Sequence, residues 1–220
     1  PGTLPNHWTS SGGAAGARYE VVGTGTVFGI PYVDIRVFGT TSSASGVAIR
    51  FDTHSILATA KDEAINFSSF IGLAGGSTSG FTFIRPCLVE HRANGTNAQT
   101  HYLASIRDAL SPEMARLSVN RTMAHADTAS VRAELELTFA SGQALDMTLR
   151  IAAPQLEKGI AASIPLLTAG TFGQRSADTL TLYLPSGEHA LELHFSDAER
   201  QTISTAGGEV TLGRAELDGE

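Results

Sequence analysis

The chain has 220 residues, only 17% of them charged, and its formal net charge at pH 7 is −7. The sequence argues against nucleic acid as a partner, because it contains no cluster of lysine and arginine to displace phosphate counterions. It also argues against membrane insertion, because no run approaches the roughly 18 consecutive apolar residues that a spanning helix needs. With 23 glycines and abundant serine and threonine, the composition favours an all-β chain whose surface is covered by hydroxyl and backbone groups.

A single cysteine, Cys87, excludes an internal disulfide framework. It stands in the segment FIRPCLVE, among residues that favour a strand. We therefore predict that Cys87 is a buried, small, apolar side chain and not a reactive thiol.

The first part of the chain is predicted to form short strands with few helical turns. Trp8 follows an extended segment, where it either anchors the chain in the core or offers a platform for a sugar ring. Arg36 and Arg50 lie on the polar sides of two alternating segments, and Phe70 lies on a hydroxyl-rich face of a third. Residues 54–64 are the one place where a helical turn is expected. The strands expected before residue 130 span 19–22, 32–38, 47–52, 65–76, 81–92 and 115–123.

Residues 131–159 carry the clearest pattern in the sequence. Residues 131–139 and 145–153 both alternate apolar and polar side chains, which is the period of a strand buried on one face. Ser141, Gly142 and Gln143 supply turn chemistry between them. The sequence therefore predicts two adjacent antiparallel strands that bury an aliphatic layer and display a face of arginines and carboxylates.

The pattern weakens after residue 159 and resumes as three or four short strands with glycine-containing turns near residues 186–187 and 207–208. We predict a domain at 1–160, a connector at 161–174 and a small β-hairpin unit at 175–220. So short a run of hairpins rarely stands alone, so the unit is expected to pack on another surface.

Several segments give the chain a family resemblance. GTLPNHW, YEVVGTGTVFGIPYVDIRVFGTTSS, ARLSVNRTMAHADTASVRAEL and DMTLRIAAPQLEKG together resemble a carbohydrate-binding module of phage and prophage virion proteins, most strongly at IPYVDIR and APQLE. That module is similar to the jelly-roll modules that bind xylan and glucan. The resemblance covers about residues 1–160 and implies a jelly-roll β-sandwich of two antiparallel sheets, to which the chain adds the small C-terminal β unit.

No catalytic motif is visible in the sequence. Nucleophile elbows, HExxH and paired CxxC motifs are absent. Glu134 and Glu136 lie two residues apart on one strand face, at a spacing that a pair of glycosidase carboxylates could use. Flanking arginines would keep both of them ionised, so neither is suited to the acid role. We therefore expect a protein that is not an enzyme.

The charged face has a better use in ligand binding. Forked guanidinium donors and carboxylate acceptors match the vicinal hydroxyls of sugars or acidic sugars, and an aromatic ring can stack on a pyranose. An equally weighted interpretation is that these charges form cross-strand salt bridges on a solvated or subunit-covered surface. The residues predicted to contact a glycan are Tyr32, Arg36, Arg50, Phe70, Arg132, Glu134, Glu136 and Arg150.

The resemblance also implies a metal and a biological setting. In similar jelly-roll modules a last-strand aspartate binds a structural calcium ion, and Asp146 occupies a comparable place. The implied role is a glycan-binding module on a fibre, spike or tail of a phage, or on a phage-like particle such as a gene transfer agent, that attaches to a cell-surface polysaccharide of the host. It would lie on the virion surface, contact other virion subunits and form homo-oligomers. The alternatives are a purely structural virion protein and an ancillary module of a polysaccharide-degrading enzyme.

Overall fold

The chain forms two compact units, residues 1–172 and residues 173–220, in a computed structural model. The structure describes residues 2–11, 15–27, 29–51, 57–163, 165, 180–194 and 200–212. Most of the predicted connector, 161–174, therefore lies outside the described residues, and the predicted boundaries stay predictions. None of the described residues belongs to a helix of the length and hydropathy that crossing a membrane would require.

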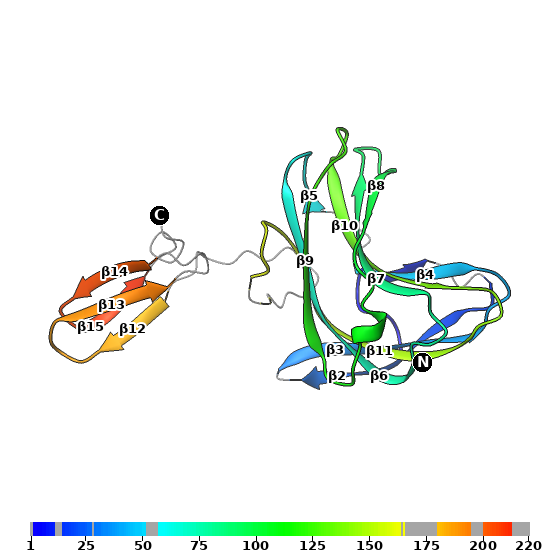
Figure 1. Cartoon of the computed structure of the whole chain (residues 1–220), viewed down its shortest axis with the longest axis horizontal. Coiled ribbons are helices and arrows are strands. Elements are labelled where there is room, and N and C mark those ends of the chain that lie inside the picture. The colour runs from blue at the N-terminus through cyan, green and yellow to red at the C-terminus, as the bar shows by residue number, and fades with distance from the viewer. Residues whose placement is uncertain are drawn as a thin grey trace. The chain divides into compact units, whose positions relative to one another are not determined.

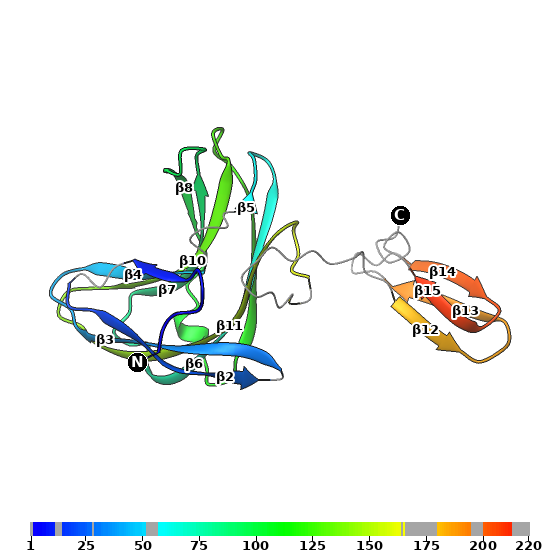
Figure 2. The same ribbon diagram turned by 180° about the vertical axis from the view of Figure 1, so that it is seen from behind.

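The first unit is a sandwich of two antiparallel sheets, which confirms the predicted all-β fold class. Figures 1 and 2 show strands β2, β3, β6 and β11 below strands β4 and β7. Sheet 1 consists, in order, of β1 (Thr9–Ser11), β4 (Ser45–Arg50), β10 (Ser130–Phe139), β7 (Phe83–His91) and β8 (Asn97–Tyr102), with β5 (Leu57–Ala58) beside the start of β10. Sheet 2 consists, in order, of β2 (Arg18–Val27), β3 (Ile30–Thr40), β11 (Ala144–Lys158), β6 (Ala64–Ser77) and β9 (Ala115–Thr122).

The core lies between the inward rows of the two sheets. Leu135 and Leu137 of β10 and Met147 and Leu149 of β11 are all 0% exposed, as their alternation predicts. Helix is almost absent from the described residues, which contain only the 3-10 turn η1 (Arg107–Ala109). Residues 54–64 are predicted to contain a helical turn. Residues 54–56 lie outside the described residues, and 57–64 contain β5, a non-helical turn and the first residue of β6.

The predicted pairing of residues 131–139 with 145–153 is wrong. β10 pairs with β4 and β7, whereas β11 pairs with β3 and β6, so the two strands lie in different sheets. The turn between them carries the chain from one sheet to the other, and a residue distant in sequence holds it in place. Thr41 Oγ1 donates to the carbonyl of Ala140 at 2.7 Å and accepts from the N–H of Gln143 at 2.8 Å. Each strand buries one face, as predicted. The two buried faces meet across the core of the sandwich, and the strands are not neighbours in one sheet.

Trp8 packs against the core, as its interpretation as an anchor predicts. Its ring meets Phe51 edge-on at 4.9 Å between ring centroids, and Phe51 in turn stacks on Phe67 at 5.3 Å. Such aromatic contacts combine a large buried apolar area with a defined geometry. The N-terminal segment is thereby joined to both sheets.

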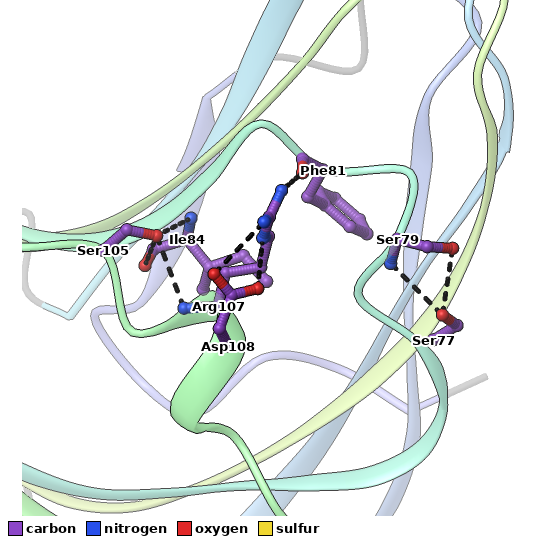
Figure 3. Close-up of polar contacts among 7 residues, drawn as sticks. All are labelled: Ser77, Ser79, Phe81, Ile84, Ser105, Arg107 and Asp108. Atoms are coloured by element: carbon purple, nitrogen blue, oxygen red, sulfur yellow. Dashed lines mark hydrogen bonds and ion pairs between the residues drawn. The ribbon is translucent and has the colours of Figure 1, made fainter.

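The start of β7 is fixed by the segment that contains η1 (Figure 3). Arg107 Nη1 donates to the carbonyl of Phe81 at 2.9 Å, and the same guanidinium donates to both carboxylate oxygens of Asp108 at 2.8 and 3.1 Å. Ser105 Oγ accepts from the N–H of Ile84 at 3.3 Å and lies 3.2 Å from its carbonyl oxygen. These contacts fix the N-terminal end of β7.

The second unit contains two antiparallel strand pairs within its described residues. β12 (Leu180–Leu184) pairs with β15 (Gly208–Leu212), and β13 (His189–His194) pairs with β14 (Arg200–Thr205). The expected glycine turns are present, and Gly187, Gly207 and Gly208 adopt positive φ angles of 136°, 86° and 86°. The predicted small C-terminal β unit is therefore confirmed.

Candidate ligand-binding groove

The outward face of sheet 1 carries a groove of about 530 Å³. β4 pairs with the second half of β10, whereas β8 flanks β7 where β7 pairs with the first half of β10. Figure 1 shows β8 and the upper part of β10 rising steeply, while β4 lies beside the lower part. We call this site the sheet-1 groove. Its lining residues are Ser11, Ser45, Gly46, Val47, Ala48, Arg50, Cys87, Val89, His91, Asn97, Thr100, Tyr102, Arg132, Glu134, Glu136 and Thr138.

Glu134 is the centre of the groove floor. It lies opposite Arg50 on β4, and Arg132 precedes it by two residues on the same face of β10. Its Oε1 accepts from Arg50 Nε at 3.1 Å, from Arg132 Nε at 2.9 Å and also from Arg132 Nη2. Glu134 is only 8% exposed, so these bonds compensate for the removal of its carboxylate from water.

An exposed aromatic edge borders the floor. Glu136 Oε2 accepts from Arg85 Nε at 2.7 Å. The Arg85 guanidinium lies 4.0 Å from the centre of the Tyr102 ring and 4.8 Å from that of Phe83. Tyr102 is 52% exposed although the cation holds it in place from one side. The groove therefore has a ring whose position is fixed but whose surface remains accessible.

Cys87 lies on the floor, opposite Glu134 on one side and Tyr102 on the other. It is buried, as predicted. Burial and the nearby charge of Glu136 raise the pKa of its thiol to about 12. A thiol with so high a pKa contributes shape to the groove and little nucleophilic reactivity.

The charges that line the groove cancel. Arg50 and Arg132 oppose Glu134 and Glu136, and the rest of the lining is apolar, hydroxyl or amide in character apart from His91. Each glutamate accepts a hydrogen bond from an arginine. Within the described ranges no group of three or more His, Cys, Asp or Glu side chains is placed to hold a metal ion. The arrangement is suited to hydrogen bonding with a hydroxyl-rich ligand.

The prediction of a single charged face is wrong. Arg36, Arg150, Tyr32 and Phe70 belong to β3, β11 and β6 and lie on the outward face of sheet 2, on the other side of the sandwich. Both sheets show the same alternation in sequence, so the pattern does not distinguish them. Whether these four residues contact a ligand stays a prediction, separate from the sheet-1 groove.

Ion pairs already occupy Arg36 and Arg150, the two predicted contact arginines on sheet 2. Arg150 Nε and Nη2 donate to the two oxygens of Asp34, both at 2.8 Å, and its guanidinium lies 3.9 Å from the centre of the Tyr32 ring. The Phe70 ring lies 5.8 Å from the guanidinium of Arg116. The Arg150–Asp34 pair, which joins β11 to β3, fits the interpretation of the sheet-2 charges as cross-strand salt bridges.

Asp146 is likewise bound to a cation. Both of its oxygens accept from Arg36, at 2.8 and 3.1 Å, and this hydrogen bonding lowers the pKa of the Asp146 carboxyl. A calcium ion here would have to displace a guanidinium group, and Asp146 belongs to no group of three or more His, Cys, Asp or Glu side chains in the described part of the chain that could hold a metal ion. The donor set does not fit calcium, and the predicted calcium site stays a prediction without structural support.

The sequence pattern did not reveal Tyr102 and His91 as groove residues. β8 is polar along its length, so its alternation gives no strand signal. The available signal was Asn94-Gly95, a strong hairpin dipeptide. It implies that the residues after the turn return beside those before it, which places Tyr102 next to Cys87.

Comparisons with known proteins gave likenesses only among solved structures. A scan against protein-family models and a search of curated proteins found no match. A carbohydrate-binding module of the β-sandwich superfamily aligns with a TM-score of 0.49 and 15% identity over 71% of this chain and 58% of that one. An arabinose-bound α-L-arabinofuranosidase aligns with a TM-score of 0.45 and 12% identity over 70% of this chain. The CBM22-1 xylan-binding domain from Paenibacillus barcinonensis aligns with a TM-score of 0.41 and 16% identity over 70% of this chain and 87% of that one.

The chain spans only 23% of the length of the arabinofuranosidase. All three TM-scores are below 0.5, so these likenesses do not establish a function for the chain.

Proposed function

We propose that this chain is a non-catalytic module that binds a glycan in the sheet-1 groove. The observation that carries the proposal is Tyr102, a half-exposed ring at the edge of a groove whose floor is built of arginine and glutamate. A pyranose has an apolar C–H face and a rim of hydroxyl groups. The ring and the polar floor of the groove match these two sides of the sugar.

The geometry supports recognition at low entropic cost. The guanidinium of Arg85 contacts the Tyr102 ring and is itself bound to Glu136, so the ring does not have to be ordered on binding. On the floor, Arg50 and Arg132 are held by Glu134 with their guanidinium groups next to the groove. Groups fixed in advance lose little freedom when hydroxyl groups bind to them.

Non-catalytic binding is supported by the state of the two glutamates. Hydrolysis of a glycosidic bond requires one carboxyl group that donates a proton and a second one that stays ionised. Glu134 and Glu136 both accept hydrogen bonds from arginine, so each carboxylate already serves as an acceptor within the floor of the groove.

A glycan array followed by calorimetric titration tests the proposal. Substitutions of two exposed tyrosines, one in the groove and one outside it, serve as the test variant and its control. Tyr102→Ala is expected to weaken binding at least tenfold, because a stacked ring contributes roughly 1.5 kcal/mol. Tyr19→Ala removes another exposed tyrosine, on β2 of sheet 2, and is expected to leave affinity unchanged. The proposal is overturned if the wild type binds no glycan at millimolar concentration, or if Tyr102→Ala binds as tightly as the wild type.

The setting of the module is a second part of the proposal. The sequence resemblance supports display on a phage or phage-like particle, where many copies would turn weak single-site binding into firm attachment. An ancillary module of a polysaccharide-degrading enzyme fits the same groove equally well. Mass spectrometry decides between them, since it would find peptides of this chain either in purified particles or in a secreted glycosidase. If the chain is instead a purely structural virion protein, its peptides should be found in purified particles but the chain should bind no glycan.

A further inference from the structure

His91 is a buried side chain that lines the sheet-1 groove. It ends β7, immediately before the turn that leads into β8, and is 5% exposed. It lies opposite Asn97 of β8 and Ser130 of β10, neither of which is charged.

The hydrogen bond of one ring nitrogen fixes the tautomer. His91 Nδ1 lies 3.1 Å from the carbonyl oxygen of Gly95. A carbonyl can only accept, so Nδ1 carries the hydrogen and, in the neutral ring, Nε2 carries a lone pair. Gly95 reaches this position with a φ of 79°, in the turn typical of Asn-Gly.

The second ring nitrogen has no partner. His91 Nε2 is buried and makes no hydrogen bond within the described ranges. Buried polar atoms are nearly always hydrogen-bonded, because an unmet acceptor loses its water without compensation. A donor supplied by a ligand would restore that bond. His91 lines the groove, so that donor would come from a ligand bound there.

We propose that His91 Nε2 accepts a hydrogen bond from a hydroxyl group of the bound glycan. This end of the groove then selects a sugar unit that presents a donor and rejects one that presents a carboxylate or sulfate, which can only accept. The inference rests on the proposed function. It adds the chemical class of the sugar at this position, and names His91 as a specificity-determining residue.

The charge state of the imidazole agrees with this role. Burial, followed by the charges of Arg132 on β10 and Arg50 on β4, lowers the pKa of His91, although the hydrogen bond to Gly95 and the charge of Glu134 oppose them. The ring is therefore neutral at pH 7 and keeps its acceptor. Glycan affinity is expected to stay constant from pH 8 to about pH 6.5, the ordinary histidine pKa, and to fall at lower pH as Nε2 becomes protonated.

Two substitutions separate the proposed role from a structural one. In His91→Asn the amide nitrogen replaces Nδ1 and can still donate to Gly95, but the acceptor at Nε2 is gone. In His91→Gln the amide reaches the Nε2 position and keeps an acceptor there, but the bond to Gly95 is lost. Calorimetric titration of the whole chain would use xylohexaose and cellohexaose, which are uncharged, and hexagalacturonate, which carries carboxylates.

We expect the wild type to bind an uncharged hexasaccharide more tightly than hexagalacturonate. His91→Asn should weaken that binding at least tenfold and abolish its loss below pH 6.5, whereas His91→Gln should stay within about threefold of the wild type. The reverse order would mean that the ring only supports the turn, and would overturn the inference. If His91→Asn does not fold, the affinity and pH profile of His91→Gln decide, because an amide does not titrate. If the wild type binds none of the three probes, this inference fails with the proposed function; if it binds and His91→Asn binds equally well, only the inference about His91 fails.

Discussion

Glu90 offers the sharpest test of how the groove is supported. Its side chain lies on the inward side of β7 and is 0% exposed. Its carboxylate accepts from the N–H of Ala124 at 2.9 Å and from the N–H of His125 at 3.1 Å, and it also binds Thr128 Oγ1 and His101 Nε2. The carboxylate therefore joins β7 to the segment before β10 and to β8, the strand that carries the Tyr102 ring.

Glu90→Gln keeps the shape of the side chain but replaces one acceptor oxygen with an amide nitrogen. The amide N–H groups then face two groups that are themselves donors. In one orientation of the amide these are the N–H of His125 and the hydroxyl of Thr128. Breaking a buried charged network in this way costs about 3–5 kcal/mol of the free energy of unfolding. At roughly 2–4 °C per kcal/mol for a unit of this size, the melting temperature should fall by about 6–20 °C. Thr128→Val removes a single bond and should cost only about 1–2 kcal/mol.

The loss should depend on pH in a defined direction. Burial acts to raise the pKa of Glu90, but the hydrogen bonds from Ala124, Thr128, His101 and His125 outweigh it and lower the pKa below its ordinary value of 4.5. A carboxyl whose pKa is lower in the folded state stabilises the fold fully above its unfolded pKa, and loses that contribution as pH falls through the folded value. Thermal melts followed by circular dichroism from pH 7 to pH 3 should show the gap between wild type and Glu90→Gln narrowing below about pH 4.5. The reasoning is refuted if the two proteins melt within 2 °C of each other at pH 7, or if the gap stays constant down to pH 3.

Two further predictions concern titratable groups. Because the pKa of Cys87 is raised to about 12, the native protein should react with iodoacetamide at pH 8 at least a hundredfold more slowly than the protein in urea; comparable rates would show that the thiol is accessible and ionised. The hydrogen bond from Lys158, with others from Thr59 and the N–H of Ala60, lowers the pKa of Glu63 to about 2, so its carboxyl should titrate near that pH by NMR. Lys158→Met should move this pKa toward 4.5, and an unchanged titration would exclude Lys158 as its main cause.

The faces of the strands could be predicted from the sequence, but their partners could not. Alternation is a property of single residues, and those predicted to point inward, such as Leu135 and Leu149, are fully buried. Alternation says which side of a strand meets a core. It does not say whether the next strand lies beside it in the same sheet or opposite it in the facing one. The turn at residues 140–143 allows both arrangements, and the contact with Thr41, a residue distant in sequence, accompanies the second.

The candidate site was predictable in part for the same reason. Four of the predicted ligand contacts share the groove, because β4 and β10 are neighbours and present the same parity outward. The places of Tyr102 and His91 depend on the pairing of β8 with β7 and on the hairpin at Gly95, which no charge pattern encodes. The positions of Arg36 and Arg150 follow from the assignment of β3 and β11 to sheet 2, which is a long-range property of the fold.

The two outward faces contain the same residue types but use them in opposite ways. On sheet 2 the fork of Arg150 meets both oxygens of Asp34, so that this arginine and this carboxylate satisfy each other. On the sheet-1 floor, Arg50 and Arg132 direct three hydrogen bonds to the same oxygen of Glu134, and Oε2 accepts none from the described residues. The second oxygen is thus an acceptor next to two guanidinium groups, which is the donor-and-acceptor pattern that a pair of vicinal hydroxyls requires. The pairing geometry, and not the presence of charge, therefore distinguishes the sheet-1 floor, where the proposal places a sugar beside Tyr102, from the Arg150–Asp34 salt bridge on sheet 2.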